Sequence, residues 1–456
     1  MKYLIYGINY SPELTGIGKY NGEMATWLAE QGHEVRVVTA HPYYPDWKVF
    51  PDHCSWRYAR TRENGVTVIR CPLYVPAKPT ALKRLLHLAS FSFSSALALF
   101  ANIGWRPDKV ILVVPTLFCA SQAILYAKLT GANSLLHIQD FEVDAMFGLG
   151  LCKCKRVIQF ANAAEAWTLK AFDEISTISG GMMARARNKG VNDEKLSLFP
   201  NWSEISRFQG VTKSPELLKR LGAPAEKKVV MYSGNIGEKQ GLEIVIRAAE
   251  LLETRDDLVF LIIGEGAGKS RLVESVRLKG LCNVLFAPLQ SYDDLPSLLA
   301  SADCHLVIQR RGAADAVLPS KLTNILAVGG NAVITADPTT SLGVLCSEYP
   351  GIGALVEPEC ALALVEGIKR CIAMASPNRI AVAYAQEFLD KERILARFMA
   401  GHAAPVVGEA IPGSGVTVSA YSDVQVSAAS RVGPLHGSPL IAQGRASASA
   451  GLAVEK

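Results

Sequence analysis

Hydrophobic residues in the first 200 positions form short runs, separated by stretches with the 3.6-residue period of amphipathic helices. Fully apolar runs are typical of strands buried on both faces of a parallel sheet. The expected strands are Tyr3–Gly7, Val35–Thr39, Val66–Arg70, Val110–Val114, Ser134–Gln139 and Glu174–Ile178. The expected helices are Ile17–Glu30, Leu82–Ile103, Cys119–Thr130 and Val157–Ala171. This alternation predicts βαβ units and a doubly wound α/β domain.

The alternation breaks near Leu198–Trp202 and restarts at Lys228. The second set of expected strands is Val229–Ser233, Val259–Gly264, Val284–Ala287, His305–Ile308, Ala332–Thr335 and Ala354–Val356. The helices expected between and after them are Gly241–Leu252, Ser270–Lys279, Asp293–Ala300, Lys321–Ala327 and Ala361–Cys371. The pattern therefore predicts two Rossmann-like domains with parallel sheets, which we expect to face a cleft.

We place the domains at residues 1–205 and 206–376, followed by a terminal helical stretch at 377–400. Residues 401–456 are rich in Ala, Ser, Gly and Val, carry few charges and show no helical or strand period. A segment of this kind cannot bury enough apolar surface to offset the entropy of ordering. We therefore expect a disordered tail.

The chain has 47 Lys and Arg against 42 Asp and Glu, and the whole excess lies in residues 1–205, which carry 22 against 17. A weakly basic half is compatible with an anionic membrane surface or a phosphate-bearing substrate, but does not indicate nucleic acid. The ten cysteines form no CxxC pair, which favours reduced thiols in the cytoplasm over zinc or disulfides. The first residues run directly into a strand, so we expect no secretory signal.

The segment Leu85–Trp105 contains no charged residue, and Lys83, Arg84 and Arg106 flank it. It is long enough to span a membrane, but several serines and a histidine dilute it. We prefer a helix lying on the membrane surface. A helix packed only against the sheet is an equally supported interpretation.

Glycine-rich turns follow several expected strands, where open α/β sheets bind ligands. Gly16 and Gly18 precede a helix whose N-terminus favours anions, although the long turn and the Thr39-Ala40 strand end do not fit a dinucleotide fingerprint. A turn without a ligand is as well supported here. The loop Gly264–Ser270 ends in Gly-Lys-Ser but is one residue shorter than a P-loop, so it is a near miss for ATP binding.

Two further turns suit a diphosphate. Residues Ser233–Gly241 combine Gly234, Asn235 and Lys239 with a helix start. In Leu318–Asn324, Pro319 presets a turn, Ser320 is a possible cap, and Lys321 opens a helix. A lysine in the first helical turn opposes the helix dipole unless an anion binds beside it. This favours a binding role for Lys321 over a solvated surface lysine.

The segment His137–Asp144 follows a first-domain strand and contains Asp140. Its acids and histidine could serve as a general base or hold an acceptor. Glu142 and Asp144 could also suggest a metal, but a solvated loop is the commoner outcome for such a pair. We therefore predict no metal site.

Together these stretches resemble the family 4 glycosyltransferases, which have the GT-B fold, over roughly residues 1–400. The opening Tyr6–Tyr20, with Gln139-Asp140-Phe141 and Pro319-Ser320-Lys321, is similar to the colanic-acid biosynthesis type, associated with fucose transfer. The resemblance implies that the turn at Gly16 and Gly18 closes over the donor phosphates and faces the acceptor. It also implies that the second domain binds the nucleotide, and that the terminal helix crosses back to the first domain.

The resemblance further implies donor-binding roles for a set of residues in the second domain. These are Gly234, Asn235, Lys239, Gly264, Glu265, Gly266, Gln290, Pro319, Ser320 and Asn324. Asp140 and Lys321 are the candidate catalytic residues. The chain departs from the family at the Glu-x7-Glu pattern, where Ala316 and Asn324 stand, and at the phosphate-motif arginine, where Asn235 stands. A carboxylate nucleophile is therefore not expected, and the family's retention of configuration implies front-face transfer.

These expectations define a retaining hexosyltransferase without a cofactor. It would move a sugar, with GDP-fucose the first donor to test, to a polyprenyl-diphosphate-linked oligosaccharide in exopolysaccharide biosynthesis. Its expected location is the cytoplasmic face of the membrane, bound peripherally through the first domain. The competing hypotheses are a GT-B-fold nucleotide-sugar epimerase, a P-loop-like NTPase acting through Gly264–Ser270, and a non-catalytic nucleotide-sugar sensor.

Overall fold

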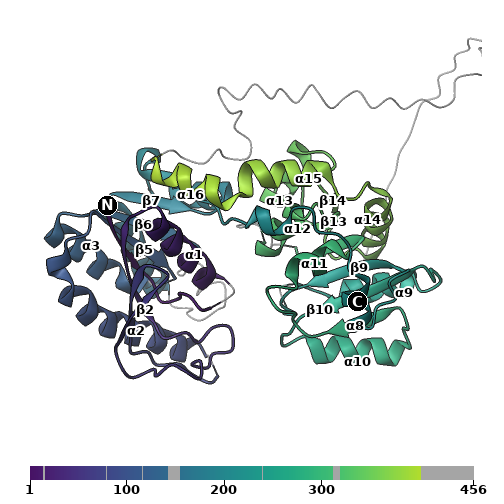
Figure 1. The fold of residues 1–456 in the computed structure, drawn as a ribbon, viewed down its shortest axis with the longest axis horizontal. Coiled ribbons are helices and arrows are strands. Elements are labelled where there is room, and N and C mark those ends of the chain that lie inside the picture. Colours follow the sequence, from purple (N-terminus) through teal and green to yellow (C-terminus); the bar gives the residue numbers. More distant parts are fainter. Residues whose placement is uncertain are drawn as a thin grey trace, which may run out of the picture. The chain divides into compact units, whose positions relative to one another are not determined.

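The structure is a computed structural model of the chain, and it describes residues 1–13, 16–78, 80–115, 117–141, 155–238, 240–311 and 319–401. Figure 1 shows two sets of strands, each accompanied by helices. The predicted tail, apart from Gly401, lies outside the described residues.

The first sheet has eight strands in the order β3-β4-β2-β1-β5-β6-β7-β8. Its strands are β1 (Lys2–Tyr6), β2 (Glu34–Ala40), β3 (Ala59–Glu63), β4 (Val66–Cys71), β5 (Lys109–Val114), β6 (Asn133–Ile138), β7 (Glu174–Thr177) and β8 (Leu196–Leu198). All neighbours pair in parallel except β3, which is antiparallel to β4. The reversal of strand order at β1 is the mark of a doubly wound sheet.

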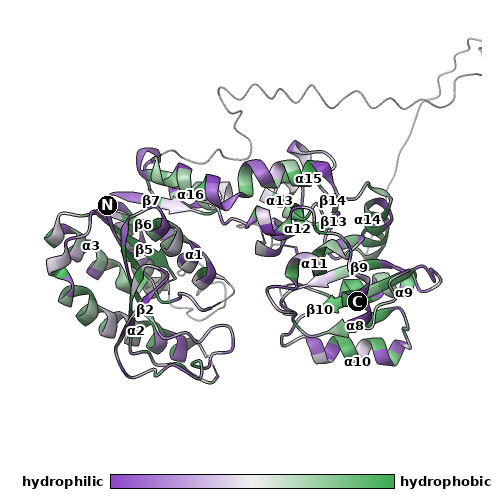
Figure 2. Cartoon of the chain, viewed as in Figure 1, coloured by the Kyte–Doolittle hydropathy of each residue, from purple (hydrophilic) through white to green (hydrophobic). Residues whose placement is uncertain are grey.

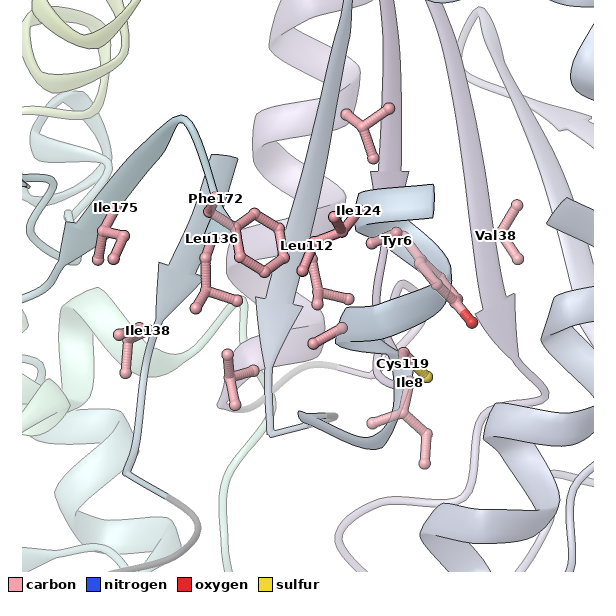
Figure 3. Close-up of a cluster of buried hydrophobic side chains, with 14 of the residues drawn as sticks. Tyr6, Ile8, Val38, Leu112, Cys119, Ile124, Leu136, Ile138, Phe172 and Ile175 are labelled. Atoms are coloured by element: carbon pink, nitrogen blue, oxygen red, sulfur yellow. The ribbon is translucent and has the colours of Figure 1, made fainter. Parts of the chain in front are cut away.

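Helices cover both faces of the first sheet. They are α1 (Ile17–Glu30), α2 (Ala81–Ala101), α3 (Ala120–Thr130), α5 (Lys155–Ala171) and α6 (Gly180–Asn188), with short 3-10 turns η1 (Ile103–Trp105), η2 (Leu117–Cys119) and η3 (Asp193–Lys195). On one face, Tyr6 and Leu112 pack with residues of α2 and α3, and Figure 3 shows this cluster around Phe172 and Ile124. On the other face, Tyr3 and Ile5 pack with α1. Side chains of β1 therefore alternate between two separate cores.

The second sheet has six parallel strands in the order β11-β10-β9-β12-β13-β14. They are β9 (Lys228–Ser233), β10 (Leu258–Ile263), β11 (Val284–Ala287), β12 (Cys304–Val307), β13 (Ala332–Thr335) and β14 (Ala354–Val356). Figure 2 shows hydrophobic colouring along central strands of both sheets, including β5 and β10. Because β10 is buried along its whole length, it needs the continuous apolar run Leu-Val-Phe-Leu-Ile-Ile.

The helices of this half are α7 (Ile205–Phe208), α8 (Pro215–Arg220), α9 (Glu243–Leu251), α10 (Lys269–Lys279), α11 (Leu295–Ala300), α12 (Ser320–Ala327), α13 (Ser341–Glu348) and α14 (Ala361–Ala373). One face of the sheet packs with α9, α10 and α14. The opposite face packs with α8, α11, α12 and α13 in two adjoining clusters. The expectation of two parallel-sheet α/β domains is confirmed.

The described part of the chain ends with α15 (Arg379–Tyr384), a π-helical turn η4 (Ala385–Leu389) and α16 (Lys391–Met399). Ile394 and Leu395 of α16 are buried in the first-sheet core beside α1. The ring of Phe398 stacks on Phe199 with 3.9 Å between centroids. Trp27 of α1 donates its Nε1–H to Glu392 at 2.6 Å. The last helix therefore belongs to the hydrophobic core of the first half of the chain.

Strand β3 was not predicted because Ala-Arg-Thr-Arg-Glu has no apolar alternation. It is an exposed edge strand, joined to β4 through Asn64 and Gly65, which both have positive φ (48° and 82°). An Asn-Gly pair between two strands is a hairpin signal that the sequence did contain. Helices α6 and α13 were also missed, and each is short and begins after a serine or threonine cap, Ser179 and Thr340.

Candidate functional site

The turns after β9 and β10 lie against each other at the carboxyl edge of the second sheet. Gly234 N–H donates to Ile263 O at 2.9 Å, and Ile236 N–H donates to Glu265 O at 2.9 Å. The structure therefore brings together five of the predicted donor-binding residues, namely Gly234, Asn235, Gly264, Glu265 and Gly266.

The glycines permit this close approach. A Cβ atom at Gly264 would overlap the carbonyl oxygen of Gly234, and one at Gly266 would overlap that of Ile236. Gly234 and Gly266 also have positive φ values of 145° and 151°, which side chains rarely adopt. The contact between the two turns thus requires glycine at these positions, in addition to the phosphate binding that the sequence suggested.

Lys321 lies in the first turn of α12 and points toward the Gly234 turn. Its Nζ is 3.8 Å from where a Cβ of Gly234 would stand. Burial lowers the pKa of Lys321 from 10.5 to about 7. Among the described residues no carboxylate lies within ion-pair distance of its ammonium group. A buried cation without a counter-ion is costly, and a bound anion would compensate it.

A small cavity of 60 Å³ is lined by Lys321 and Asn324, with Ser233 at the end of β9. The Oδ1 atom of Asn324 accepts a hydrogen bond from Ser203 Oγ at 2.8 Å. Asn324 therefore lies beside Lys321, and Ser203 holds its amide group. Sequence reasoning did not single out Ser203, because only the fold brings the segment after β8 to α12.

The remaining predicted residues of the second half occupy different settings. Pro319 is the N-cap of α12 and Ser320 is its first helical residue, so the expected capping by Ser320 is wrong: a proline already holds that position. The side-chain amide of Gln290 donates to Pro288 O at 2.8 Å.

The lysine of the near-miss P-loop, Lys269, forms an ion pair with Glu265 at 2.6 Å. Lys239 and Ala316 lie outside the described residues.

In the first half, Gly16 has φ 64° and immediately precedes α1. A Cβ atom at Gly18 would lie 2.7 Å from both Cβ and Oε2 of Glu13. Gly18 therefore leaves room for a buried carboxylate. Glu13 accepts hydrogen bonds from Tyr43 N–H and Tyr44 N–H, both at 3.0 Å, and burial raises its pKa. Glu13 lies in the opening motif Tyr6–Tyr20, where the sequence indicated no role for it.

Asp140 is exposed just after β6. His137 on the same strand is buried, and desolvation lowers its pKa to about 3. Its Nδ1 lies 2.9 Å from Ser176 Oγ, and its Nε2 lies 3.0 Å from the Gln139 amide. His137 is therefore a neutral structural histidine and not a general base near pH 7. Glu142 and Asp144 lie outside the described residues.

A cavity of 320 Å³ lies beside Glu13, and its wall includes Lys19, Glu23, Tyr292 and Lys391. Trp202 donates its Nε1–H to Glu23 at 2.6 Å, and Lys391 donates to Glu204 at 3.0 Å. None of the predicted site residues is in this wall. Within the residues that the structure describes, no cluster of three or more potential metal ligands occurs.

Comparison with known proteins assigns the class. Residues 15–202 match the family described as glycosyl transferase 4-like domain, and residues 213–388 match glycosyl transferases group 1. The chain belongs to the group 1 (family 4) glycosyltransferases. It is 58% identical over 405 residues to a protein of Escherichia coli (strain K12) named as the colanic acid biosynthesis glycosyl transferase WcaI, covering 88% of this chain and 99% of that one.

More distant similarities agree. The chain is 26% identical over 245 residues to a protein of Bacillus subtilis (strain 168) named as the teichuronic acid biosynthesis glycosyltransferase TuaC, covering 52% of this chain and 53% of that one. Among solved structures, sucrose-phosphate synthase from Thermosynechococcus elongatus matches with a TM-score of 0.65 and 16% identity, covering 88% and 98% of the two chains. Anabaena Alr3699/HepE in complex with UDP matches with a TM-score of 0.61 and 14% identity, covering 88% and 99%. The predicted GT-B fold and glycosyltransferase activity are confirmed.

Proposed function

We propose that this glycosyltransferase moves a sugar from a nucleoside-diphosphate donor to a lipid-linked oligosaccharide during synthesis of a colanic-acid-type exopolysaccharide. The likeness to WcaI over nearly its whole length supports the polysaccharide class. The observation that carries the donor class is the partly buried ammonium group of Lys321 beside the Gly234 turn, which has no ion-pair partner among the residues that the structure describes. A diphosphate is an anion of suitable charge for this place.

The base and the sugar of the donor are the parts to be identified. GDP-fucose is the first donor to test because of the resemblance to fucose-transferring enzymes. UDP-sugars are the main alternative, since HepE, which shares the fold, was solved with UDP and with UDP-glucose. Lys321 would contact the diphosphate and Asn324 the adjoining ribose in either case.

Cleavage of the sugar–phosphate bond increases the negative charge on the departing diphosphate. Lys321, placed near the carboxyl end of β9 and in the first turn of α12, would stabilise this charge without moving. The free backbone N–H groups at the N-terminus of α12 would also favour an anion beside Lys321. A preplaced cation of this kind acts mostly on the transition state.

Transfer is proposed to retain the anomeric configuration by a front-face route, in which the leaving phosphate helps to deprotonate the acceptor hydroxyl. Asp140 is the acidic residue that we assign to the acceptor side, since it is exposed at the carboxyl end of β6. His137 is excluded from this role because its ring is buried and hydrogen-bonded.

The test is a thermal-shift panel of GDP-, UDP- and ADP-sugars on the full chain, followed by measurement of nucleotide release with a lipid-linked acceptor. A donor at a hundred times its dissociation constant adds about 2.7 kcal/mol of stability. We expect one nucleotide class to give this stabilisation in the wild type and much less in Lys321→Met. Equal stabilisation of both proteins would contradict the role of Lys321, and no response to any nucleotide sugar would contradict the donor class.

A further inference from the structure

One face of α2 exposes a line of large apolar side chains. Leu82, Leu86, Phe93 and Leu97 are 68%, 52%, 76% and 61% exposed. At 100° per residue, these positions fall within about 60° around the helix axis. Contiguous exposed apolar side chains on a soluble surface mark an interaction site. We call these four residues the α2 face.

The opposite side of α2 is fastened to the sheet. Phe91 and Leu99 are fully buried in the first-sheet core. Ser95 Oγ lies 2.6 Å from Tyr6 Oη, and Ser94 Oγ donates to Pro72 O at 2.6 Å. The segment Leu82–Ala101 is long and apolar enough to cross a membrane. Crossing would break these hydrogen bonds and expose the sheet core, so the helix remains on the domain.

Aromatic residues of neighbouring segments border the α2 face. Tyr58 donates its hydroxyl hydrogen to Ser94 O at 2.9 Å and remains 49% exposed. Phe118, whose carbonyl accepts from Ser92 Oγ, is 46% exposed. Tyrosine, whose ring has one polar end, is enriched where a membrane meets water, so the position of Tyr58 fits such a boundary.

The chain segments that form this face and its α3 neighbour carry basic but no acidic residues. Between Glu63 and Asp108 the sequence has no acidic residue, and α3 has none either. Lys78, Lys83 and Lys128 are exposed in this region. An apolar helix face flanked by exposed lysines is complementary to an anionic lipid headgroup layer.

We infer that the α2 face docks onto an anionic phospholipid bilayer. Leu82, Leu86, Phe93 and Leu97 enter the boundary between headgroups and acyl chains, while Lys83 and Lys128 meet lipid phosphates. Docking is independent of the proposed sugar transfer, since it involves none of the residues assigned to the donor.

The experiment measures binding of the purified full chain to vesicles of phosphatidylcholine with and without phosphatidylglycerol. We expect stronger binding to the anionic vesicles, and weaker binding as salt increases. Phe93→Ser with Leu97→Ser should weaken binding at least about tenfold. The matched control is Val273→Ser with Leu278→Ser, since these exposed apolar residues lie on α10 of the other sheet and should not alter binding.

A second variant tests the charges without touching any packed residue. Lys83→Gln with Lys128→Gln should weaken binding to anionic vesicles by about fivefold for each lysine. Thermal unfolding checks that each variant is folded. Equal binding of the wild type to both kinds of vesicle, or no loss in either variant, would overturn the inference. A wild-type dimer in light scattering that Phe93→Ser with Leu97→Ser abolishes would assign the face to a second copy of the chain.

Discussion

The ammonium group of Lys321 lies 4.1 Å from the centre of the Tyr232 ring. Tyr232 is the residue before Ser233 at the end of β9, and its hydroxyl donates to Asn235 O at 2.6 Å. The hydroxyl group of Tyr232 therefore fixes the predicted phosphate turn through Asn235, while the face of its ring contacts the ammonium group of Lys321. A cation–π contact recovers only part of the hydration that a buried ammonium loses. The site is consequently prepared for an anion.

Replacement of Lys321 by methionine removes the charge and retains most of the side-chain volume. We expect kcat to fall by about 10²–10³, with a smaller change in KM, because the charge of the leaving group grows in the transition state. Lys321→Arg should restore only part of the activity, since its planar fork is shaped differently. Lys369→Met on α14, where the lysine is paired with Glu366, is the control. Unchanged steady-state kinetics in Lys321→Met would refute the assignment.

The lowered pKa of Lys321 predicts a pH dependence of donor binding. Its protonated form attracts the diphosphate, and the free protein loses this proton as pH rises through about 7. Above that pH the donor dissociation constant should rise by up to about tenfold per pH unit. Lys321→Met should not show this rise. Titration calorimetry from pH 6 to pH 9 measures it, and parallel profiles for the two proteins would contradict the prediction.

The same group changes the pH dependence of folding. Unfolded Lys321 keeps its proton up to its ordinary pKa of 10.5, while the folded form loses it near 7. The unfolded state thus binds more protons between these values, and the unfolding free energy should rise with pH across this window. Below pH 7 Lys321 is protonated in both states, so the unfolding free energy is lowered by the full cost of burying the charge. Denaturant unfolding of the wild type and Lys321→Met at pH 7 and pH 9 should show the difference shrinking at the higher pH.

Gly264 should tolerate no side chain. A Cβ atom there would overlap Gly234 O, so Gly264→Ala must separate the turns after β9 and β10. We expect a loss of at least about 2 kcal/mol in the unfolding free energy, together with weaker donor binding. Gly104→Ala is the control, since open space surrounds its Cβ position, and it should change stability by less than about 0.5 kcal/mol. Similar stability of the two variants in urea would disprove the packing argument.

Glu13 should be important for the loop before α1. Its Oε1 accepts the N–H groups of Tyr43 and Tyr44, and its Oε2 accepts from Asn9 at 2.9 Å. Glu13→Ala would leave these buried donors without partners, at a cost of about 1–3 kcal/mol for each backbone group. Glu13→Gln should be milder, because one oxygen remains. Glu194→Ala, at an exposed position, serves for comparison, and a Glu13→Ala protein as stable as that control would contradict this role.

Turnover should survive a chelator. The prediction is based on lysine and helix N–H groups beside the proposed diphosphate site, which can stabilise the leaving group in place of a metal ion. Activity is measured after dialysis against EDTA, with and without added Mg²⁺ or Mn²⁺. A loss that either metal restores would show that the donor binds as a metal complex.

Several site residues could be identified from the sequence because their signal is local. Lys321 follows a proline at a helix start, and Gly234, Gly264 and Gly266 stand directly after apolar strand runs. Such signals do not depend on other parts of the chain. The roles of Ser203 and Glu13 could not be predicted, because their partners are 121 and about 30 positions away. The interpretation of Ser320 as a cap was wrong by one residue, within the usual uncertainty of a helix boundary.

The sequence by itself determined that this protein has two parallel sheets with helices between their strands, since a strand buried on both faces requires an uninterrupted apolar run and each run is a local property. It also contained the motifs of the glycosyltransferase family. Only the tertiary structure decided that Lys321 is partly buried with no carboxylate partner in the described part of the chain, and that the glycines after β9 and β10 allow two backbones to touch. Burial and close approach depend on segments that the fold brings together, and the pattern of any one segment does not contain them.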